Sequence, residues 1–252
     1  QKIENLMIVV ITISNSDENI NQIKKVAKNL QIKISNIFCL NNRLNYFKLF
    51  YKYAFKRKNI LILGAYYNSA FYILGRIINF NKLFFIDDGL ETAFIGRLNV
   101  ANEFLISKLF KWKYSSSGIH FSFFKDLNIK YLSHNNFLHL KSKIKNKTIN
   151  DLVFLLGSNF IESNMLTFNQ YQNYITKVKS RYSPQNIFYM PHRRELASNY
   201  NRYGLKILKP EVCFEIYLTT LDFLPKCILG FYSTALITSK IILSKINKNG
   251  NN

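Results

Sequence analysis

Apolar and polar stretches alternate along the first half of the chain in the order expected for strands and helices. Leu6–Ile13 is a continuous apolar run, which is typical of a strand buried on both faces. Asn21–Leu30 carries apolar residues at helical spacing behind the capping residues Ser16 and Asp17, and predicts a short amphipathic helix. The further elements expected here are strands at 34–40, 59–64 and 83–86 and helices at 44–55, 68–79 and 103–113. Such a βαβα series predicts a parallel sheet covered by helices.

The alternation loosens between residues 115 and 150 and then resumes. A turn cluster at 115–118 and a lysine-rich run at 141–147 separate the two periodic parts. The elements expected after them are strands at 152–157, 186–190, 206–208 and 227–231 and helices at 167–181, 211–221 and 234–245. We therefore expect an α/β fold of two Rossmann-type halves, 1–140 and 151–252, facing a central crevice that holds the ligands. The second half has fewer elements than a complete Rossmann half, and a missing C-terminal segment would explain the difference.

The chain is strongly basic, with 35 lysines and arginines against 14 aspartates and glutamates and a formal net charge of +21. Nucleic acid, anionic lipid and phosphorylated glycans would all be attracted to such a surface. Lysine, asparagine, isoleucine and tyrosine are abundant together, as in AT-rich coding, so part of the charge follows from composition alone. The 22 phenylalanines and 16 tyrosines are dispersed and form no recognisable single-strand-binding motif. We expect no nucleic acid partner, and the inner face of a membrane is the leading candidate for a surface role.

Targeting and redox signals favour a cytoplasmic protein, peripheral at the inner membrane if its charge has a surface role. Each apolar run is too short to span a bilayer, and Asp17 and Glu18 follow the first run where a signal peptide would continue. The sequence has no initial methionine, so we expect a trimmed chain. The three cysteines have no spacing that suggests pairing or metal binding, which suits a reducing compartment.

Two adjacent carboxylates stand at the tip of the strand expected at 83–86. Asp87, Asp88 and Gly89 follow this apolar run directly, and acids at a strand tip have a use where the tip faces a site. A carboxylate there can deprotonate a hydroxyl nucleophile, because partial burial and a neighbouring like charge raise its pKa. The competing interpretation is an acidic turn in which one aspartate caps a helix.

A histidine, two arginines and a glutamate follow the strand expected at 186–190. The imidazole of His192 could contact a phosphate or protonate a leaving phosphate oxygen, and Arg193 and Arg194 offer bidentate phosphate recognition. Glu195 could pair with either arginine and hold it in place. The alternative is an arginine-rich loop on an already basic protein. The other histidines are interpreted as surface or structural residues: His120, His134 and His139.

Two hydroxyl residues, Ser233 and Thr234, follow the strand expected at 227–231 and open the last helix. Their hydroxyls and the N–H groups of a helix N-terminus form a ready anion site. Simple N-capping is the plainer interpretation, and the two are compatible. The sequence contains no phosphate-loop, dinucleotide, zinc or nucleophile-elbow motif, and we expect no protein-held metal.

The three motifs together resemble those of bacterial sialyltransferases, and specifically the lipooligosaccharide sialyltransferase family (glycosyltransferase family 52) and the related capsule polysialyltransferases. The acidic-acidic-glycine motif of that family would be Asp87-Asp88-Gly89, its histidine motif Pro191-His192-Arg193 and its paired hydroxyl motif Ser233-Thr234. The spacing of roughly a hundred and then forty residues is similar to that of the family. Leu155-Leu156-Gly157-Ser158 also looks like the family's first strand and loop of the second half.

The resemblance implies a GT-B fold and an inverting, metal-independent transfer. Sialic acid, or a related nonulosonate, would pass from a CMP-activated donor to a terminal galactose-type hydroxyl of a bacterial lipooligosaccharide or capsule glycan. Asp87 or Asp88 would act as general base on the acceptor hydroxyl. His192 would contact the donor phosphate and serve as acid toward the departing CMP. The CMP-sugar would be a co-substrate, and no cofactor is expected.

The donor phosphate and nucleotide would, by the same resemblance, be bound from the second half. The residues implied are Gly157, His192, Arg193, Ser233, Thr234 and, for the cytidine or ribose, Glu211. For Glu211 an ordinary acid in the first turn of a helix is the simpler interpretation.

One position departs from the family pattern, because Arg193 stands where many relatives have proline after the histidine. The donor therefore stays open, and a GT-B transferase that uses CMP-Kdo or a nucleoside diphosphate sugar is an alternative. A non-catalytic basic protein that binds membrane or nucleic acid is an alternative from another class. No pattern in the sequence indicates an oligomeric state.

Overall fold

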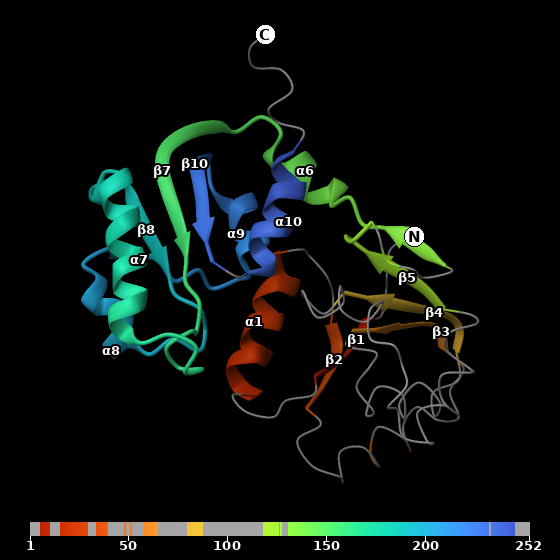
Figure 1. Ribbon diagram of the computed structural model, residues 1–252. Coiled ribbons are helices and arrows are strands. Elements are labelled where there is room, and N and C mark those ends of the chain that lie inside the picture. Colours follow the sequence, from red (N-terminus) through yellow and green to blue (C-terminus); the bar gives the residue numbers. More distant parts are fainter. Residues whose placement is uncertain are drawn as a thin grey trace. The chain divides into compact units, whose positions relative to one another are not determined.

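The computed structural model describes residues 6–10, 16–29, 34–39, 48, 51, 58–64, 80–87, 118–125, 127, 131–231 and 233–244, and Figure 1 labels their helices and strands. The chain divides into two compact units, Gln1–Asn136 and Phe137–Asn252. Each unit contains a four-stranded parallel sheet, and the first unit has an additional parallel pair of strands. The α/β class predicted from the alternating pattern is confirmed.

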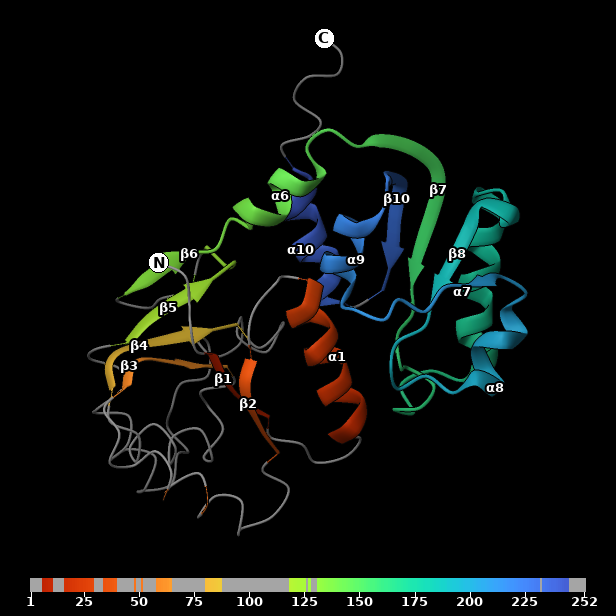
Figure 2. The same cartoon turned by 180° about the vertical axis from the view of Figure 1, so that it is seen from behind.

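The sheet of the first unit runs in chain order. Its strands are β3 (Lys58–Leu63), β4 (Phe80–Ile86), β5 (Gly118–Ser122) and β6 (Leu132–His134), in the order β3-β4-β5-β6. The additional pair is β1 (Leu6–Val10) with β2 (Ile34–Cys39), and α1 (Ser16–Asn29) connects them along the chain (Figure 2). Strands are confirmed where they were expected, at 6–13, 34–40, 59–64 and 83–86, except that residues 11–13 and 40 lie outside the described residues. The helix expected at 21–30 begins earlier, at Ser16. The helices expected at 44–55, 68–79 and 103–113 fall outside the described residues, except for Lys48 and Tyr51, which are helical.

The sequence pattern misses β5, β6 and α6 (Leu138–Ile144), all within the segment where periodicity loosens. β5 places a half-buried His120 between the exposed Ile119 and Phe121, so its burial does not follow residue polarity. The ring centroids of His120 and Phe85 are 4.6 Å apart, and burial lowers the pKa of His120 to about 4. β6 has only three residues, too few to show an alternating pattern.

The sheet of the second unit has the strand order of a Rossmann fold. Its strands are β7 (Thr148–Leu156), β8 (Ile187–Met190), β9 (Lys206–Ile207) and β10 (Phe223–Gly230), all parallel, in the order β10-β7-β8-β9. The first strand in the chain is therefore central, the second and third extend to one side, and the fourth is added on the other. This arrangement is compatible with the first four strands of a Rossmann fold.

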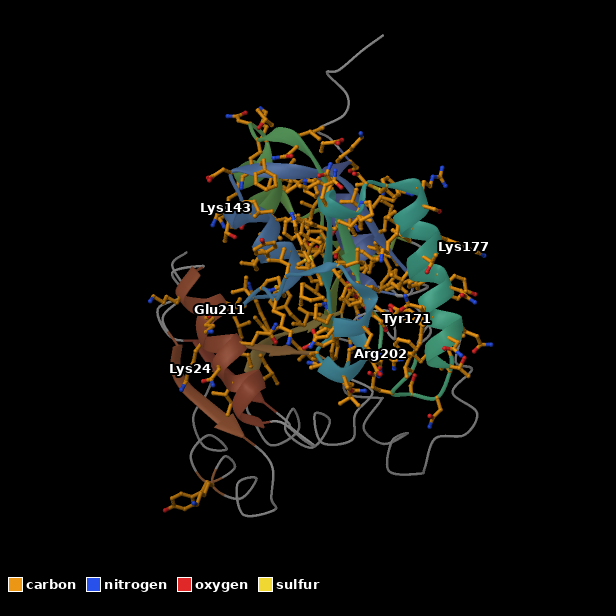
Figure 3. All side chains as sticks on the ribbon, turned by 90° about the vertical axis from the view of Figure 1, so that its left-hand side faces the viewer. Lys24, Lys143, Tyr171, Lys177, Arg202 and Glu211 are labelled. Carbon is orange, nitrogen blue, oxygen red and sulfur yellow. The ribbon has the colours of Figure 1, made fainter. Side chains whose placement is uncertain are left out.

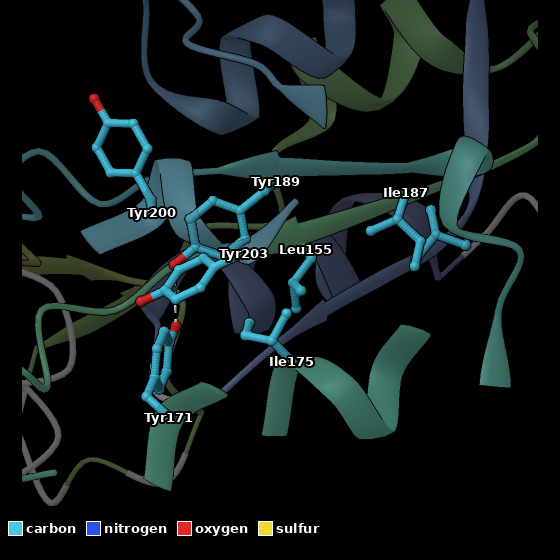
Figure 4. Close-up of a cluster of buried hydrophobic side chains, with 8 residues drawn as sticks. Leu155, Tyr171, Ile175, Ile187, Tyr189, Tyr200 and Tyr203 are labelled. Atoms are coloured by element: carbon cyan, nitrogen blue, oxygen red, sulfur yellow. Dashed lines mark hydrogen bonds between the residues drawn. The ribbon is translucent and has the colours of Figure 1, made fainter. Parts of the chain in front are cut away.

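Helices cover both faces of this sheet, as the alternation of side chains along its strands requires. On one face α7 (Phe168–Arg181) packs Tyr171 and Ile175 against the strands, and Figure 4 shows this cluster. On the other face Phe154 and Leu156 of β7 pack against residues of α9 (Phe214–Thr220). The remaining elements of the unit are η1 (Pro184–Asn186), α8 (Ala197–Tyr200), η2 (Asn201–Tyr203) and α10 (Thr234–Leu243). The helices expected at 167–181 and 234–245 are confirmed.

Charged side chains lie on the outside of the second unit. Figure 3 shows Lys143 of α6 and Lys177 of α7 pointing outward, whereas Tyr171 lies inside. None of the helices in the described part of the chain combines the length and apolar character that a membrane span requires.

The side chain of Lys147 caps the C-terminal end of α9. Its Nζ donates hydrogen bonds to the carbonyl oxygens of Leu218, Thr219 and Leu221, the Thr219 contact being 2.8 Å. These carbonyls lie at or just beyond the last turn of the helix, where no further helical N–H can reach them. The lysine therefore supplies the partners and the positive charge that a helix C-terminus favours.

The substitution Lys147→Met is expected to lower the free energy of unfolding by about 1–2 kcal/mol, because it leaves these carbonyls without their charged donor. Urea unfolding followed by circular dichroism measures the change. Lys145→Met, at an exposed neighbouring position, is the control. Equal stability of the two variants would contradict the capping role.

Candidate functional site

The carboxyl ends of the parallel strands of the second unit meet at one edge of the sheet. Leu156, at the end of β7, pairs with Gly230 of β10 on one side and with Met190 of β8 on the other. The loops that follow these three strands therefore start side by side. The chain proceeds from β7 toward β8 and later returns to the opposite side of β7 as β10, so the strand order reverses between β7 and β10. Ligands of open α/β sheets bind outside the carboxyl ends at such a reversal.

Ser233 and Thr234 lie on the β10 side of this reversal. Ser233 is the N-cap of α10, and its Oγ accepts the N–H of Ala235 at 3.2 Å. Its carbonyl accepts the N–H of Leu236 at 3.1 Å, and Thr234 is the first helical residue. The capping interpretation is confirmed. Anion binding at this helix N-terminus stays a prediction, which the position at the sheet edge favours.

Gly157 and Ser158 lie on the β7 side. A Cβ atom added at Gly157 would overlap Oε2 of Glu195 and would lie 2.6 Å from the Tyr189 Oη and 2.9 Å from its Cζ. Only glycine allows the backbone to run so close to these side chains. The N–H of Ser158 donates to the Oη of Tyr171 at 3.2 Å. The hydroxyl of Ser158 is buried, and no residue in the described part of the chain forms a hydrogen bond with it.

His192 lies two residues beyond the end of β8 and is half-buried. Its Nδ1 accepts the N–H of Arg194 at 3.2 Å, so the neutral ring carries its proton on Nε2. Burial lowers the pKa of His192, and the charges of Arg193 and Arg194 lower it further. Near pH 7 the ring is therefore mainly neutral, with its Nε2–H able to donate to an anion. A bound phosphate would raise this pKa again and favour proton donation.

The side chain of Glu195 is buried inside the unit. The sequence had suggested instead that it pairs with Arg193 or Arg194. Its Oε1 accepts the Tyr189 hydroxyl at 2.5 Å, and its Oε2 accepts the N–H of His192 at 2.6 Å. Burial raises the pKa of this carboxyl to about 7, against the opposing effect of these two hydrogen bonds. Arg193 and Arg194 are exposed, whereas both oxygens of Glu195 have described partners inside the unit.

Glu211 does not lie in the first turn of a helix, where the sequence pattern had placed it. The helix predicted at 211–221 is α9, which begins at Phe214 with Cys213 as its N-cap. Glu211 therefore precedes the helix and is exposed in the loop after β9 (Figure 3). The first-turn acid of α9 is Glu215, because the helix starts only where its buried residues can pack on the sheet.

In the first unit, three polar side chains stand in register at the carboxyl ends of adjacent strands. Asp87 follows β4, Ser122 ends β5 and His134 ends β6. Ile86 pairs with Phe121, which places Asp87 beside Ser122, and Ser122 itself pairs with His134. Sequence reasoning treated His134 as structural and did not consider Ser122, because β5 and β6 were not recognised as strands.

The carboxylate of Asp87 is partly buried in this cluster. Its Oδ2 accepts the N–H of Phe123 at 2.7 Å, and the hydroxyl of Ser122 also bonds to the carboxylate. Burial raises the Asp87 pKa, while these hydrogen bonds and the nearby His134 act in the opposite direction. The raised pKa predicted for an acid at this strand tip is confirmed for Asp87, with burial as its cause. Asp88 and Gly89 lie outside the described residues.

The described residues contain no group of three His, Cys, Asp or Glu side chains that could hold a metal ion. No protein-family model matches the chain, and no curated protein matches it significantly.

Proposed function

We propose that the chain is a GT-B glycosyltransferase, in which the first unit carries the acceptor-side base and the second binds a CMP-activated donor. It would move sialic acid, or a related nonulosonate, to a terminal galactose-type hydroxyl of a bacterial surface glycan. The observation that carries the proposal is that Gly157, His192 and Ser233 follow three neighbouring parallel strands at one sheet edge, beside the reversal of strand order. The basic surface would hold the enzyme at the cytoplasmic face of the inner membrane.

The donor chemistry suits groups that strengthen their contacts as negative charge develops. When the bond between the sugar and the phosphate of the donor breaks, CMP leaves with an additional negative charge on the phosphate. The Nε2–H of His192, the N-terminus of α10 and Arg193 would each interact more strongly with that charge than with the intact donor. Such differential binding accelerates the step that breaks the bond. In its protonated form, which a bound phosphate favours, His192 would also supply its Nε2 proton to the departing phosphate oxygen and would return to the neutral ring.

The acceptor chemistry requires a base for a sugar hydroxyl. Asp87 would take the hydroxyl proton while the oxygen attacks the anomeric carbon of the donor sugar, and CMP would leave from the opposite face with inversion. A carboxylate with a raised pKa accepts this proton more readily than an exposed aspartate does. The burial of Asp87 supports this role, and Asp88 remains the other candidate.

CMP at millimolar concentration is expected to raise the melting temperature, because a ligand of the native state alone stabilises that state. Transfer from CMP-sialic acid to a lactose-type acceptor is expected in the wild type. His192→Ala and one of Asp87→Ala and Asp88→Ala should reduce it at least about 100-fold, the typical contribution of a general acid or base. Chromatography of a labelled acceptor measures the transfer.

His139→Ala is the matched control, because His139 is exposed on α6 in the same unit as His192. Circular dichroism should show that all variants fold. Full transfer activity in all three site variants would refute the mechanism. A wild-type protein stabilised by a nucleoside diphosphate but not by CMP would instead support the transferase alternative with another donor.

A further inference from the structure

A buried chain of hydrogen bonds links the ends of β7 and β8. The N–H of Ser158 donates to the Oη of Tyr171 at 3.2 Å, and the hydroxyls of Tyr171 and Tyr189 lie 3.2 Å apart (Figure 4). Tyr189 in turn donates to Glu195, which accepts the N–H of His192 with its other oxygen. We call Tyr171, Tyr189 and Glu195 the Tyr–Glu chain. Its two ends are backbone N–H groups in loops of the proposed donor site.

The hydrogens of the Tyr–Glu chain have one consistent direction when Glu195 is ionised. The single hydroxyl hydrogen of Tyr189 goes to Glu195, so the bond between the two tyrosines must be donated by Tyr171. The oxygen of Tyr171 is then free to accept from Ser158. Each bond polarises the next toward the carboxylate, which strengthens the whole chain.

Core packing alone does not require this chain. Tyr171 and Tyr189 are fully buried, and Glu195 is 9% exposed. A buried carboxylate is unfavourable unless several hydrogen bonds compensate for the lost water. The same cluster contains Tyr203, whose ring centroid lies 5.2 Å from that of Tyr189 and whose buried hydroxyl has no hydrogen-bond partner among the described residues. Tyr203 therefore shows how a tyrosine contributes to this core by its ring alone.

The described groups that interact with Glu195 come from several elements. They are Tyr189 of β8, Tyr171 of α7, Tyr203 of η2, Glu162 of the loop after β7 and the backbone of His192. Glu162 is an acid, and its Oε1 is bonded to the N–H of Leu196 and the side chain of Asn199. The carboxylate of Glu195 is thus held by hydroxyl and backbone donors, which are directional.

We infer that Glu195 is a positioning residue for His192. Through the Tyr–Glu chain it fixes the backbone of His192 relative to that of Ser158, and so sets the place of the imidazole at the sheet edge. This inference rests on the proposed function, because the position of the imidazole affects function only if an anionic ligand binds there. The link between Glu195 and His192 can nevertheless be measured in the free protein.

The test compares Tyr189→Phe and Glu195→Gln with the matched control Tyr203→Phe. The imidazole signals of His192 are followed by nitrogen-detected NMR, with His192→Gln to assign them among the four histidines, and CMP affinity is followed by calorimetry. Tyr189→Phe and Glu195→Gln should both move the His192 signals and weaken CMP binding about tenfold, the equivalent of about one hydrogen bond to a charged group. Tyr203→Phe should leave both measurements unchanged.

Unchanged His192 signals in Tyr189→Phe, as in Tyr203→Phe, would overturn the inference even if Tyr189→Phe were less stable, because that would indicate a structural role only. Should Glu195→Gln fail to fold, Tyr189→Phe still decides the question, since it removes one oxygen and keeps the ring. A wild-type protein that does not bind CMP would contradict the proposed function. In that case the NMR signals of the free protein would still decide whether Glu195 positions His192.

Discussion

Gly157→Ala is expected to lower the free energy of unfolding of the second unit by about 3 kcal/mol or more, through overpacking and broken hydrogen bonds. The new methyl group would overlap the Glu195 carboxylate and lie 2.6 Å from the Tyr189 hydroxyl. Tyr189 is fully buried in the core cluster, so it can move aside only by displacing its packed neighbours. Glu195 can move away only by giving up its bonds to Tyr189 and to the N–H of His192. Urea unfolding monitored by tyrosine fluorescence and circular dichroism measures the loss.

Two other glycines make this prediction quantitative. A Cβ added at Gly230 would lie 3.2 Å from the Leu236 side chain and 3.3 Å from Leu156, a tight contact that needs only a small adjustment. At Gly64 the nearest atom of a described residue would be Cγ1 of Ile86, 3.7 Å away, an ordinary contact. The loss should therefore be largest for Gly157→Ala, smaller for Gly230→Ala and near zero for Gly64→Ala. If Gly157→Ala resembled Gly64→Ala, the close approach of Glu195 to this backbone would be wrong.

A double-mutant cycle isolates the contact itself. Glu195→Ala removes the group that the new methyl would displace, so the effects of Gly157→Ala and Glu195→Ala should add up to more than the effect of the double variant. Strict additivity would show that the alanine destabilises the protein for a reason unrelated to Glu195.

The fold could be predicted where the apolar pattern is long and regular. The apolar run at 152–157 and the helical pattern at 167–181 are both visible in the sequence. The structure has β7 over most of that run, although the strand begins earlier, at Thr148, and it has α7 over 168–181. β5 and β6 could not be found in this way, because they are short and burial along β5 does not follow polarity. Their recognition depends on pairing with β4, which is a contact between residues distant in the sequence.

The candidate site could be predicted only in part for a related reason. His192 and Ser233 lie two and three residues beyond the ends of β8 and β10, and a strand end is visible from sequence. The Tyr–Glu chain is different, because Tyr171 comes from α7 and meets Tyr189 only after the helix has packed on the sheet. Glu195 has two arginines before it, so a surface ion pair was the natural interpretation. The burial that directs it inward comes from the tertiary structure.

The stability of the second unit is expected to fall as the pH rises from about 4.5 to about 7 because of Glu195. Burial raises the pKa of this carboxyl from 4.5 to about 7, so in that range the folded state binds more protons than the unfolded state. Stability decreases with pH wherever the folded state is the more protonated one. A shift of this size corresponds to a total change of about 3 kcal/mol, since one pKa unit is equivalent to about 1.4 kcal/mol.

Urea unfolding at pH 5 and pH 8, in the wild type and in Glu195→Gln, measures this contribution, because other titrating groups cancel in the difference. The stability of the wild type relative to Glu195→Gln should be higher at pH 5 than at pH 8. Glu211→Gln, at an exposed carboxylate, is the control. If the free energies of unfolding of the wild type and of Glu195→Gln changed in parallel with pH, the raised pKa of a buried Glu195 would be contradicted. The predicted loss also bears on the proposed site. Above pH 7 Glu195 is ionised in the folded protein, which lowers the stability of the protein. The ionised carboxylate is also the form that accepts the hydrogen bond from the N–H of His192 most strongly.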